Sequence, residues 1–374
     1  MKRGIYIHIP FCVSKCKYCS FNSYAGKENL HTDYLSMLKN EIVFKSDKSI
    51  SIDTIYIGGG TPSILKNGEI FGILQVLKEN FNIDKDAEIS MEANPNTITK
   101  EKAEEWKRAG INRISIGLQS ANNKILKVIG RSHTLKDYLN AIKILKEVGF
   151  KNINTDLMIA LPNQRIKDVK RAIKLVAKQG VTHISCYSLI LEEGTPLYKM
   201  VEDGKLKVPK EDYAVKMYKI AVKQLQKYGF NRYEVSNFAK NGYECRHNVN
   251  CWLRHEYYGF GAGANGFING CRYGNVCDIA KYIKSIKNNA TLEEFKEKID
   301  KNDALEETLM LGLRMERGVE IKVLNEILGK DFISYRESQL KNLYNLGLIS
   351  YNNEELKATD KGFYVLNKII LELV

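Results

Sequence analysis

The chain has 374 residues, of which 44% are hydrophobic and 27% are charged, and this is typical of a soluble globular protein with a large and a smaller domain. No apolar run approaches the roughly 18 residues of a membrane span and no signal peptide opens the chain, so we expect a cytoplasmic protein with reduced thiols. The net charge of +13 is spread along the sequence, which favours a solvated lysine-rich surface, with an anionic ligand or nucleic acid as the alternative explanation.

Short β-branched runs alternate with amphipathic stretches through the first half of the chain. The runs that predict strands are residues 4–9, 53–57, 87–92, 112–118, 152–158 and 182–188. Strands joined by helices run parallel, and such connections are right-handed. Because six units are fewer than the eight of a closed barrel, we predict an α/β fold with a partial (β/α)6 barrel, and an open doubly wound sheet is the alternative.

The apolar spacing also places two of the helices, at 138–148 and 169–176, with Gly149 and Gly180 as their C-terminal stops. We expect three parts: a barrel at 1–190, an extension of it at 191–289, and a small winged-helix-like domain of helices and a hairpin at 290–374. For the last part we favour a packing role over DNA binding.

Three cysteines lie close together directly after the first predicted strand, at Cys12, Cys16 and Cys19. A structural zinc site needs four ligands and usually takes them from paired cysteines. A four-iron cluster normally takes one thiolate per iron, so three thiolates leave one iron open to a substrate or cofactor. The spacing therefore predicts a [4Fe-4S] cluster with a reactive open position.

Other polar groups follow the predicted strands, where active sites of barrels collect. Gly58-Gly-Gly-Thr-Pro62 follows the second strand, and its glycines would let the backbone approach a ligand and present amides to it. Glu92 and Asn94 follow the third strand, Gln119 ends the fourth, and Asp156 lies in the fifth. Each alone could be a cap or a polar core residue, but together they indicate a site.

The Cys-x3-Cys-x2-Cys spacing with Tyr18 before the last cysteine resembles the signature of the radical S-adenosylmethionine (radical SAM) superfamily. Further motifs in the same order resemble its oxygen-independent coproporphyrinogen III oxidase branch over nearly the full length: Tyr6-x-His8-Ile-Pro-Phe-Cys12, Gly58-Gly-Gly-Thr-Pro62, Glu92-Ala-Asn-Pro95, Ser115-Ile-Gly-Leu-Gln-Ser120 and Gly130-Arg-x-His133. The resemblance implies that the open iron binds SAM and that the cluster cleaves SAM reductively to a 5′-deoxyadenosyl radical.

The resemblance also implies which residues contact SAM. They are Tyr6, Tyr18, Gly60, Thr61, Glu92, Gln119, Arg131 and Asp156. Arg131 would pair with the methionyl carboxylate, and the carboxylates would accept from the ammonium and ribose groups. Two departures from the family pattern imply a changed backbone fit: Ala160 stands where the family usually has glycine, and Arg165 where it usually has threonine.

Two branches share this pattern, and three features separate them. The decarboxylating oxidases carry a fourth cysteine where this chain has Phe21, and they have a longer N-terminal extension. In addition, residues 246–252, Arg-His-Asn-Val-Asn-Cys-Trp, resemble the His-Asn-x-x-Tyr-Trp motif of the HemW-like haem chaperones, with Cys251 in place of tyrosine. The chain is therefore most similar to that chaperone family, which binds haem and delivers it to membrane haem proteins.

Within this resemblance, His247 is the expected haem contact, since a neutral imidazole is a common axial ligand, and a role in ordering its loop is the alternative. Cys251 could ligate haem as a thiolate, but a buried inert thiol is favoured. The remaining cysteines fit no paired-ligand spacing, so we expect them to be structural: Cys186, Cys245, Cys271 and Cys277.

The resemblance thus implies three cofactors, a [4Fe-4S] cluster, SAM and haem. Its implied partners are haem-accepting client proteins at the membrane and a reductant such as flavodoxin or ferredoxin; a homodimer is left open and nucleic acid is not expected. Reductive SAM cleavage is implied, without coproporphyrinogen oxidase activity. A coproporphyrinogen III dehydrogenase, which needs a second SAM site, is the second hypothesis, and a nucleic-acid modifier is the third.

Overall fold

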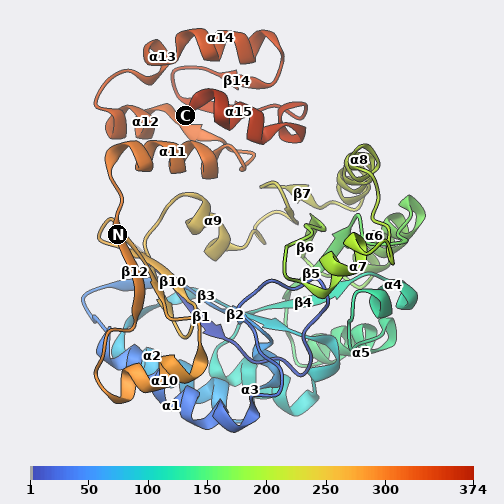
Figure 1. Cartoon of the computed structure of the whole chain (residues 1–374), viewed down its shortest axis with the longest axis vertical. Coiled ribbons are helices and arrows are strands. Elements are labelled where there is room, and N and C mark those ends of the chain that lie inside the picture. The colour runs from blue at the N-terminus through green and yellow to red at the C-terminus, as the bar shows by residue number, and fades with distance from the viewer. Residues whose placement is uncertain (1–2) are drawn as a thin grey trace.

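A curved parallel sheet forms the centre of the molecule in the computed structural model, which describes residues 3–374 (Figure 1). Its strands lie in chain order, and each pairs in parallel with the next. They are β1 (Arg3–Ile9), β2 (Ser51–Gly59), β3 (Asn82–Ala93), β4 (Arg113–Gln119), β5 (Asn152–Ile159) and β6 (His183–Ser188). The six predicted strands and the partial barrel are confirmed, and β6 does not pair with β1.

Helices connect these strands and cover the outer face of the sheet (Figure 1). They are α1 (His31–Phe44), α2 (Glu69–Asn80), α3 (Lys100–Ala109), α4 (Asn123–Val128), α5 (Leu135–Glu147) and α6 (Ile166–Lys178), with 3-10 turns at Glu28–Leu30, Pro62–Ile64 and Pro95–Thr97. Each of α5 and α6 buries one apolar stripe against the sheet. Gly149 (φ +92°) and Gly180 (φ +71°) follow them in the left-handed conformation, as expected for helix stops.

The chain after β6 extends both edges of the sheet. Its elements are α7 (Pro196–Glu202), α8 (Glu211–Lys227), β7 (Asn231–Arg232), β8 (Asn237–Ala239), α9 (Arg246–Trp252), β9 (Tyr257–Phe260), β10 (Asn265–Ile268), β11 (Cys271–Asn275), α10 (Ile279–Lys287) and β12 (Glu293–Lys298). β8 pairs with β6, whereas β9 pairs in parallel with β1 and continues into β10, β11 and β12. The buried Glu41 carboxylate on α1 anchors this second edge by accepting from Gly261 N at 2.8 Å and Asn275 Nδ2 at 2.8 Å.

A smaller region follows, and it has a hydrophobic core of its own, which includes Leu309, Leu324, Phe332 and Ile369. It consists of α11 (Lys301–Gly312), β13 (Val319–Glu320), α12 (Ile321–Leu328), α13 (Phe332–Tyr335), α14 (Glu337–Asn345), β14 (Ile349–Tyr351), β15 (Glu355–Ala358), a 3-10 turn at Gly362–Tyr364, and α15 (Leu366–Leu373). Its three strands form a separate sheet in the order β13-β15-β14. Helices with a small sheet are what the sequence predicts here.

Several contacts join this region to the rest of the molecule, including ion pairs of Glu307 on α11 with Arg254 and Arg272. Glu316 N donates to Tyr233 O at 3.0 Å, and Val235 N donates to Arg314 O at 2.9 Å. The guanidinium of Arg232 pairs with Glu316 and Asp360 and lies over the ring of Phe363. Across residues 3–374, no helix is both long and apolar enough to cross a bilayer.

Candidate functional site

A cavity of about 410 Å³ runs through the barrel interior from the cysteine loop after β1. Its size lies in the range of small-molecule sites, about 300–1,000 Å³. All three cysteines of the predicted cluster site line it. So do seven of the eight predicted SAM contacts: Tyr18, Gly60, Thr61, Glu92, Gln119, Arg131 and Asp156. The structure therefore brings together residues that come from six separate segments of the sequence.

Each cysteine of the loop has a polar neighbour. Thr61 Oγ1 donates to Cys12 Sγ at 3.4 Å, Arg131 Nη1 donates to Cys16 Sγ at 3.5 Å, and Cys19 Sγ lies 3.9 Å from Ser23 Oγ. Within residues 3–374 no three His, Cys, Asp or Glu side chains are arranged to hold a single metal ion. Three thiols that line one cavity without converging on one point suit a cluster with one thiolate per iron.

The glycine loop packs directly against the cysteine loop. Gly60 N donates to Ile9 O and Thr61 N to Phe11 O, both at 2.8 Å, and a Cβ on Gly60 would lie 2.6 Å from Phe11 O. Gly59, at φ +110°, is also required, because a Cβ there would meet the ring of His8 at 2.6 Å. These amides are therefore committed within the protein, contrary to the expectation that they face a ligand. Arg131 is one of the cations that line this cavity.

Two carboxyl groups face each other across the cavity. Glu92 accepts from Tyr56 Oη at 2.9 Å and from Gly59 N at 3.3 Å, and burial together with Asp156 raises the pKa of Glu92 to about 7. Burial likewise raises the pKa of Asp156, which accepts from Asn154 Nδ2 at 2.7 Å. Both carboxyls are suited to ammonium or hydroxyl donors, since a bound cation would favour their charged forms.

Further hydrogen bonds position Arg131 and Gln119, two of the predicted SAM contacts. Arg131 Nη2 donates to Gly117 O at 2.8 Å, and Tyr187 Oη donates to Gln119 Oε1 at 3.0 Å. Asn94 Oδ1 is buried at the cavity wall without a hydrogen-bond partner among residues 3–374. A buried acceptor of this kind calls for a donor, and a bound ligand would supply one. The residues present thus fit a cluster with a polar, partly cationic ligand beside it.

The two departures from the family pattern have structural consequences. Ala160 takes the left-handed conformation (φ +60°) that glycine adopts more readily. Arg165 occupies the N-cap of α6 without a capping side-chain hydrogen bond, although its own N–H donates to Asp168 Oδ2 at 2.9 Å. Gln164 holds the preceding turn by donating to Met158 O at 2.9 Å and accepting from Leu161 N at 3.2 Å.

A second cavity of about 390 Å³ adjoins the first and shares Phe21, Gly59 and Glu92 with it. Tyr6, the eighth predicted SAM contact, lines this cavity, and so do His247 and Cys251. The two latter residues are one turn apart on α9 and therefore lie on the same face of that helix.

The His247 ring is buried and held in place. Its Nδ1 lies 3.0 Å from Thr54 Oγ1, and its ring stacks on Tyr56 with centroids 5.3 Å apart. Burial lowers the pKa of His247 to about 4, so the imidazole is neutral at physiological pH. Burial raises the pKa of the Cys251 thiol to about 12, which agrees with an inert thiol better than with a thiolate ligand.

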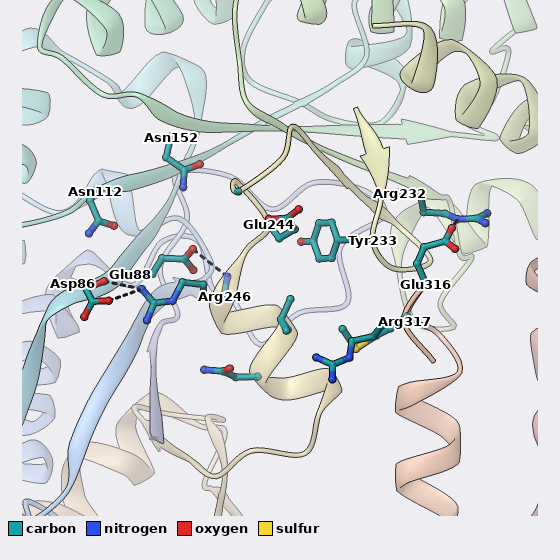
Figure 2. Close-up of a pocket in the computed structure, with 14 residues that line it drawn as sticks. Asp86, Glu88, Asn112, Asn152, Arg232, Tyr233, Glu244, Arg246, Glu316 and Arg317 are labelled. Atoms are coloured by element: carbon teal, nitrogen blue, oxygen red, sulfur yellow. Dashed lines mark hydrogen bonds and ion pairs between the residues drawn. The ribbon is translucent and has the colours of Figure 1, made fainter. Parts of the chain in front are cut away.

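A third cavity, of about 670 Å³, lies between α9, the starts of β3 to β5 and the residues after α11 (Figure 2). Its three arginines already have acidic partners. Arg232 pairs with Glu316 and Asp360, Arg246 lies 3.8 Å from Asp53 and 3.9 Å from Asp86, and Arg317 lies 2.8 Å from Glu320. This cavity is at the opposite ends of the strands from the cysteine loop, and the sequence gives no signal for it.

Arg113, Tyr56 and Thr54 are site residues that the sequence did not predict. Arg113 begins β4 and lines the first cavity, together with Ser115, Gly117 and Gln119 of the same strand. The alternation of these residues with buried Ile114, Ile116 and Leu118 is the signal that could have found it.

Comparison with known proteins agrees with this geometry. The model of the radical SAM superfamily matches residues 6–176, and that of the HemN C-terminal domain matches residues 299–365. The heme chaperone HemW of Bacillus subtilis is 35% identical over 370 residues, which is 98% of each chain. The heme chaperone HemW of Lactococcus lactis is 36% identical over 364 residues, which covers 97% of this chain and 95% of the relative.

A solved structure also resembles this one over its whole length. The coproporphyrinogen III oxidase HemN of Escherichia coli, described as a radical SAM enzyme, matches with a TM-score of 0.86 over 100% of this chain and 89% of the other. At 22% identity this likeness shows a shared fold. Taken with the full-length identity to the curated chaperones, it shows that the chain belongs to the HemW haem chaperone family of the radical SAM superfamily.

Proposed function

We propose that this protein binds a [4Fe-4S] cluster, SAM and haem, and delivers haem to haem-dependent client proteins. The observation that carries the haem part is the His247 imidazole, which is neutral, fixed through Nδ1 and placed on a cavity wall. With Nδ1 engaged by Thr54, Nε2 is the nitrogen that remains for an iron ligand. The identity to curated heme chaperones over 98% of the chain supports the same function.

Cys12, Cys16 and Cys19 would hold the cluster. When bound, a cluster with an open iron supplies the electron for reductive cleavage of SAM. The protein's own part is orientation. Arg131 would pair with the methionyl carboxylate, Glu92 and Asp156 would accept from the ammonium and ribose groups, and Tyr6 and Tyr18 would flank the ligand. Gly60 and Thr61 would shape the pocket through their packing on the cysteine loop, and Gln119 would complete it.

The haem proposal is tested by titrating the purified protein with haem and following the Soret band. We expect saturable binding that weakens in His247→Ala, because that variant removes the proposed iron ligand. Cys251→Ser is the matched control, since it lies on the same face of α9 and lines the same cavity. Equal binding by His247→Ala and the unmodified protein would remove His247 from the proposal, and loss in Cys251→Ser alone would assign the ligand to Cys251.

The same titration has an expected pH dependence. Burial lowers the pKa of His247 to about 4, so its lone pair stays available from pH 8 down to pH 5. Haem affinity should be constant over that interval and fall as the pH approaches 4. A loss of affinity centred between pH 6 and 7 would indicate a solvent-exposed histidine as the ligand instead.

Anaerobic incubation with SAM, a reductant and coproporphyrinogen III, followed by mass spectrometry, tests the alternative oxidase function. We expect no decarboxylation, because Phe21, whose side chain is 68% exposed, stands where the oxidases carry a fourth cysteine. A product that has lost two molecules of carbon dioxide would identify the protein as the oxidase. Reduced flavodoxin or ferredoxin would serve as the reductant, which also tests the expected electron donors.

A further inference from the structure

Arg113 is a buried cation without a partner. It is 2% exposed and begins β4. Within the described residues 3–374 its guanidinium takes part in no hydrogen bond or ion pair, and its Nε atom is fully buried. A buried unpaired charge is costly, so a protein keeps one where a ligand neutralises it or where a network needs it.

The neighbouring network does not use the guanidinium. The charge of Arg113 acts on the carboxyls of Glu92 and Asp156, but neither forms a hydrogen bond or ion pair with it. Glu88 is also close, but the Glu88 carboxylate accepts from Cys245 Sγ at 3.4 Å and from the N–H groups of Arg246 at 3.1 Å and His247 at 3.2 Å. Glu88 therefore caps the start of α9. Burial raises the pKa of the Cys245 thiol to about 12, so this neighbour is neutral and does not balance the charge.

The polar side chains on the other side of Arg113 are also saturated. Asn154 Nδ2 donates to Ser115 and Ser185, and its Oδ1 lies 2.6 Å from His183 Nδ1. The second ring nitrogen of His183 lies 2.8 Å from Tyr233 Oη. Arg113 is thus the free strong donor in this part of the cavity.

The guanidinium faces the ligand cavity. Arg113, Ser115, Gly117 and Gln119 are alternate residues on the inner face of β4, and all four line the cavity. At about 3.3 Å per residue, Arg113 lies about 20 Å along the strand from Gln119. Of the predicted SAM contacts, Asp156 pairs with Gly117 and Glu92 with Ser115, so Arg113 is the inner-face residue of β4 that lies beyond them.

Arg113 is also close to the candidate haem ligand. Tyr56 lines the same cavity as Arg113 and stacks on the His247 ring. The positive charge of Arg113 contributes to lowering the pKa of His247, after burial. A guanidinium fork matches the two oxygens of a carboxylate.

We propose that Arg113 binds a carboxylate of the ligand that enters the barrel interior, and, resting on the proposed haem function, that this carboxylate is a propionate of haem. The third cavity offers no equivalent, because its arginines are paired with acidic side chains; Figure 2 shows the pair of Arg246 with Asp86. SAM also carries a carboxylate, so the test must distinguish a haem propionate from the methionyl carboxylate of SAM.

The experiment compares haem with haem dimethyl ester, whose propionates are neutral, in the same non-ionic detergent. We expect the unmodified protein to bind haem about 10- to 100-fold more tightly than the ester, and Arg113→Met to lose this preference. Arg113→Lys should restore part of it. SAM affinity should be unchanged in Arg113→Met, and its melting temperature should stay near that of the unmodified protein, since the lost charge has no partner.

Arg317→Met is the matched control, because Arg317 lines the third cavity and is paired with Glu320. Equal binding of haem and its ester by the unmodified protein would overturn the inference, and so would a loss of preference in Arg317→Met. If Arg113→Met lowers SAM affinity instead, the carboxylate is that of SAM.

Iron-free protoporphyrin IX separates this inference from the proposed function, because it has propionates but no iron for His247. Binding that depends on Arg113 but not on His247 would support the inference even if iron ligation by His247 failed. Haem binding that depends on His247 with no effect of Arg113→Met would leave the proposed function standing and refute the inference. Absence of binding by either porphyrin would refute both.

Discussion

Arg131 connects two parts of the candidate site that lie 115 residues apart in the sequence, since its guanidinium donates to Cys16 Sγ. The resemblance predicts Arg131 as a ligand contact, and the cysteine spacing predicts the thiols. Neither predicts that the two would touch. Arg113 was not predicted as a site residue, because an arginine at the start of a strand is equally consistent with an exposed surface charge. Only the fold shows that this strand is buried on both faces.

The cysteine assignment predicts a specific loss at the residue scale. Cys16→Ala removes one of three thiolates, so we expect anaerobically reconstituted protein to lose its brown four-iron absorption and most of its bound iron. Cys277→Ser is the control, because Cys277 is exposed and lies outside the cavity. A complete cluster in Cys16→Ala would refute the ligand assignment, and bound zinc in the unmodified protein would refute the cluster itself.

At the scale of elements, short β-branched runs located β1 to β6, and most residues of β1, β2, β4 and β5 are indeed buried. The same patterns could not locate β12, whose sequence Glu-Glu-Phe-Lys-Glu-Lys is almost wholly exposed. Nor could they pair β9 with β1, since those strands are more than 250 residues apart and only the folded edge brings them together. Short or polar strands are specified by their neighbours rather than by their own residues.

The N-cap of α6 gives a prediction at this scale. Arg165 lacks the side-chain oxygen that caps a helix start, so Arg165→Thr should raise the free energy of unfolding by about 1 kcal/mol, as measured by urea denaturation. Thr134 caps α5 with a reciprocal capping box, so Thr134→Ala should lower the free energy of unfolding by a similar amount. No gain in Arg165→Thr would show that Asp168 N, which already donates to Arg165 O at 2.8 Å, gains nothing from a side-chain acceptor.

At the scale of the whole molecule, the terminal region has its own core but depends on a small contact with the barrel. The sequence predicts the helices and the small sheet of this region, because their apolar residues are regularly spaced. It does not predict the contact with the rest of the molecule, which includes Arg232, the ion pairs of Glu307 with Arg254 and Arg272, and a short backbone pairing at Val235 and Arg314. In the sequence, charged side chains such as Arg232 cannot be distinguished from exposed surface charges, because their burial depends on how the two regions pack.

Arg232→Met should loosen this contact. The Arg232 side chain is 3% exposed, whereas that of its partner Asp360 is 88% exposed. Because water can solvate Asp360 once Arg232 is removed, we expect the free energy of unfolding to fall by only about 1–2 kcal/mol. We expect faster hydrogen exchange in α11 to α15 and unchanged exchange in β1 to β6. Lys341→Met, which breaks an exposed pair with Glu337, should change neither. Unchanged exchange in Arg232→Met would show that the backbone pairing and the Glu307 ion pairs hold the contact without Arg232.

The missing pairing between β1 and β6 bears on how a flat macrocycle could enter. Both strands take an outer neighbour from the extension, β9 along residues 4–7 of β1 and β8 along residues 183–185 of β6. No ladder of backbone bonds therefore joins the β1 flank to the β6 flank in the part of the chain that the structure describes. Spreading the flanks to admit or release a porphyrin edge-on would leave every strand pairing intact.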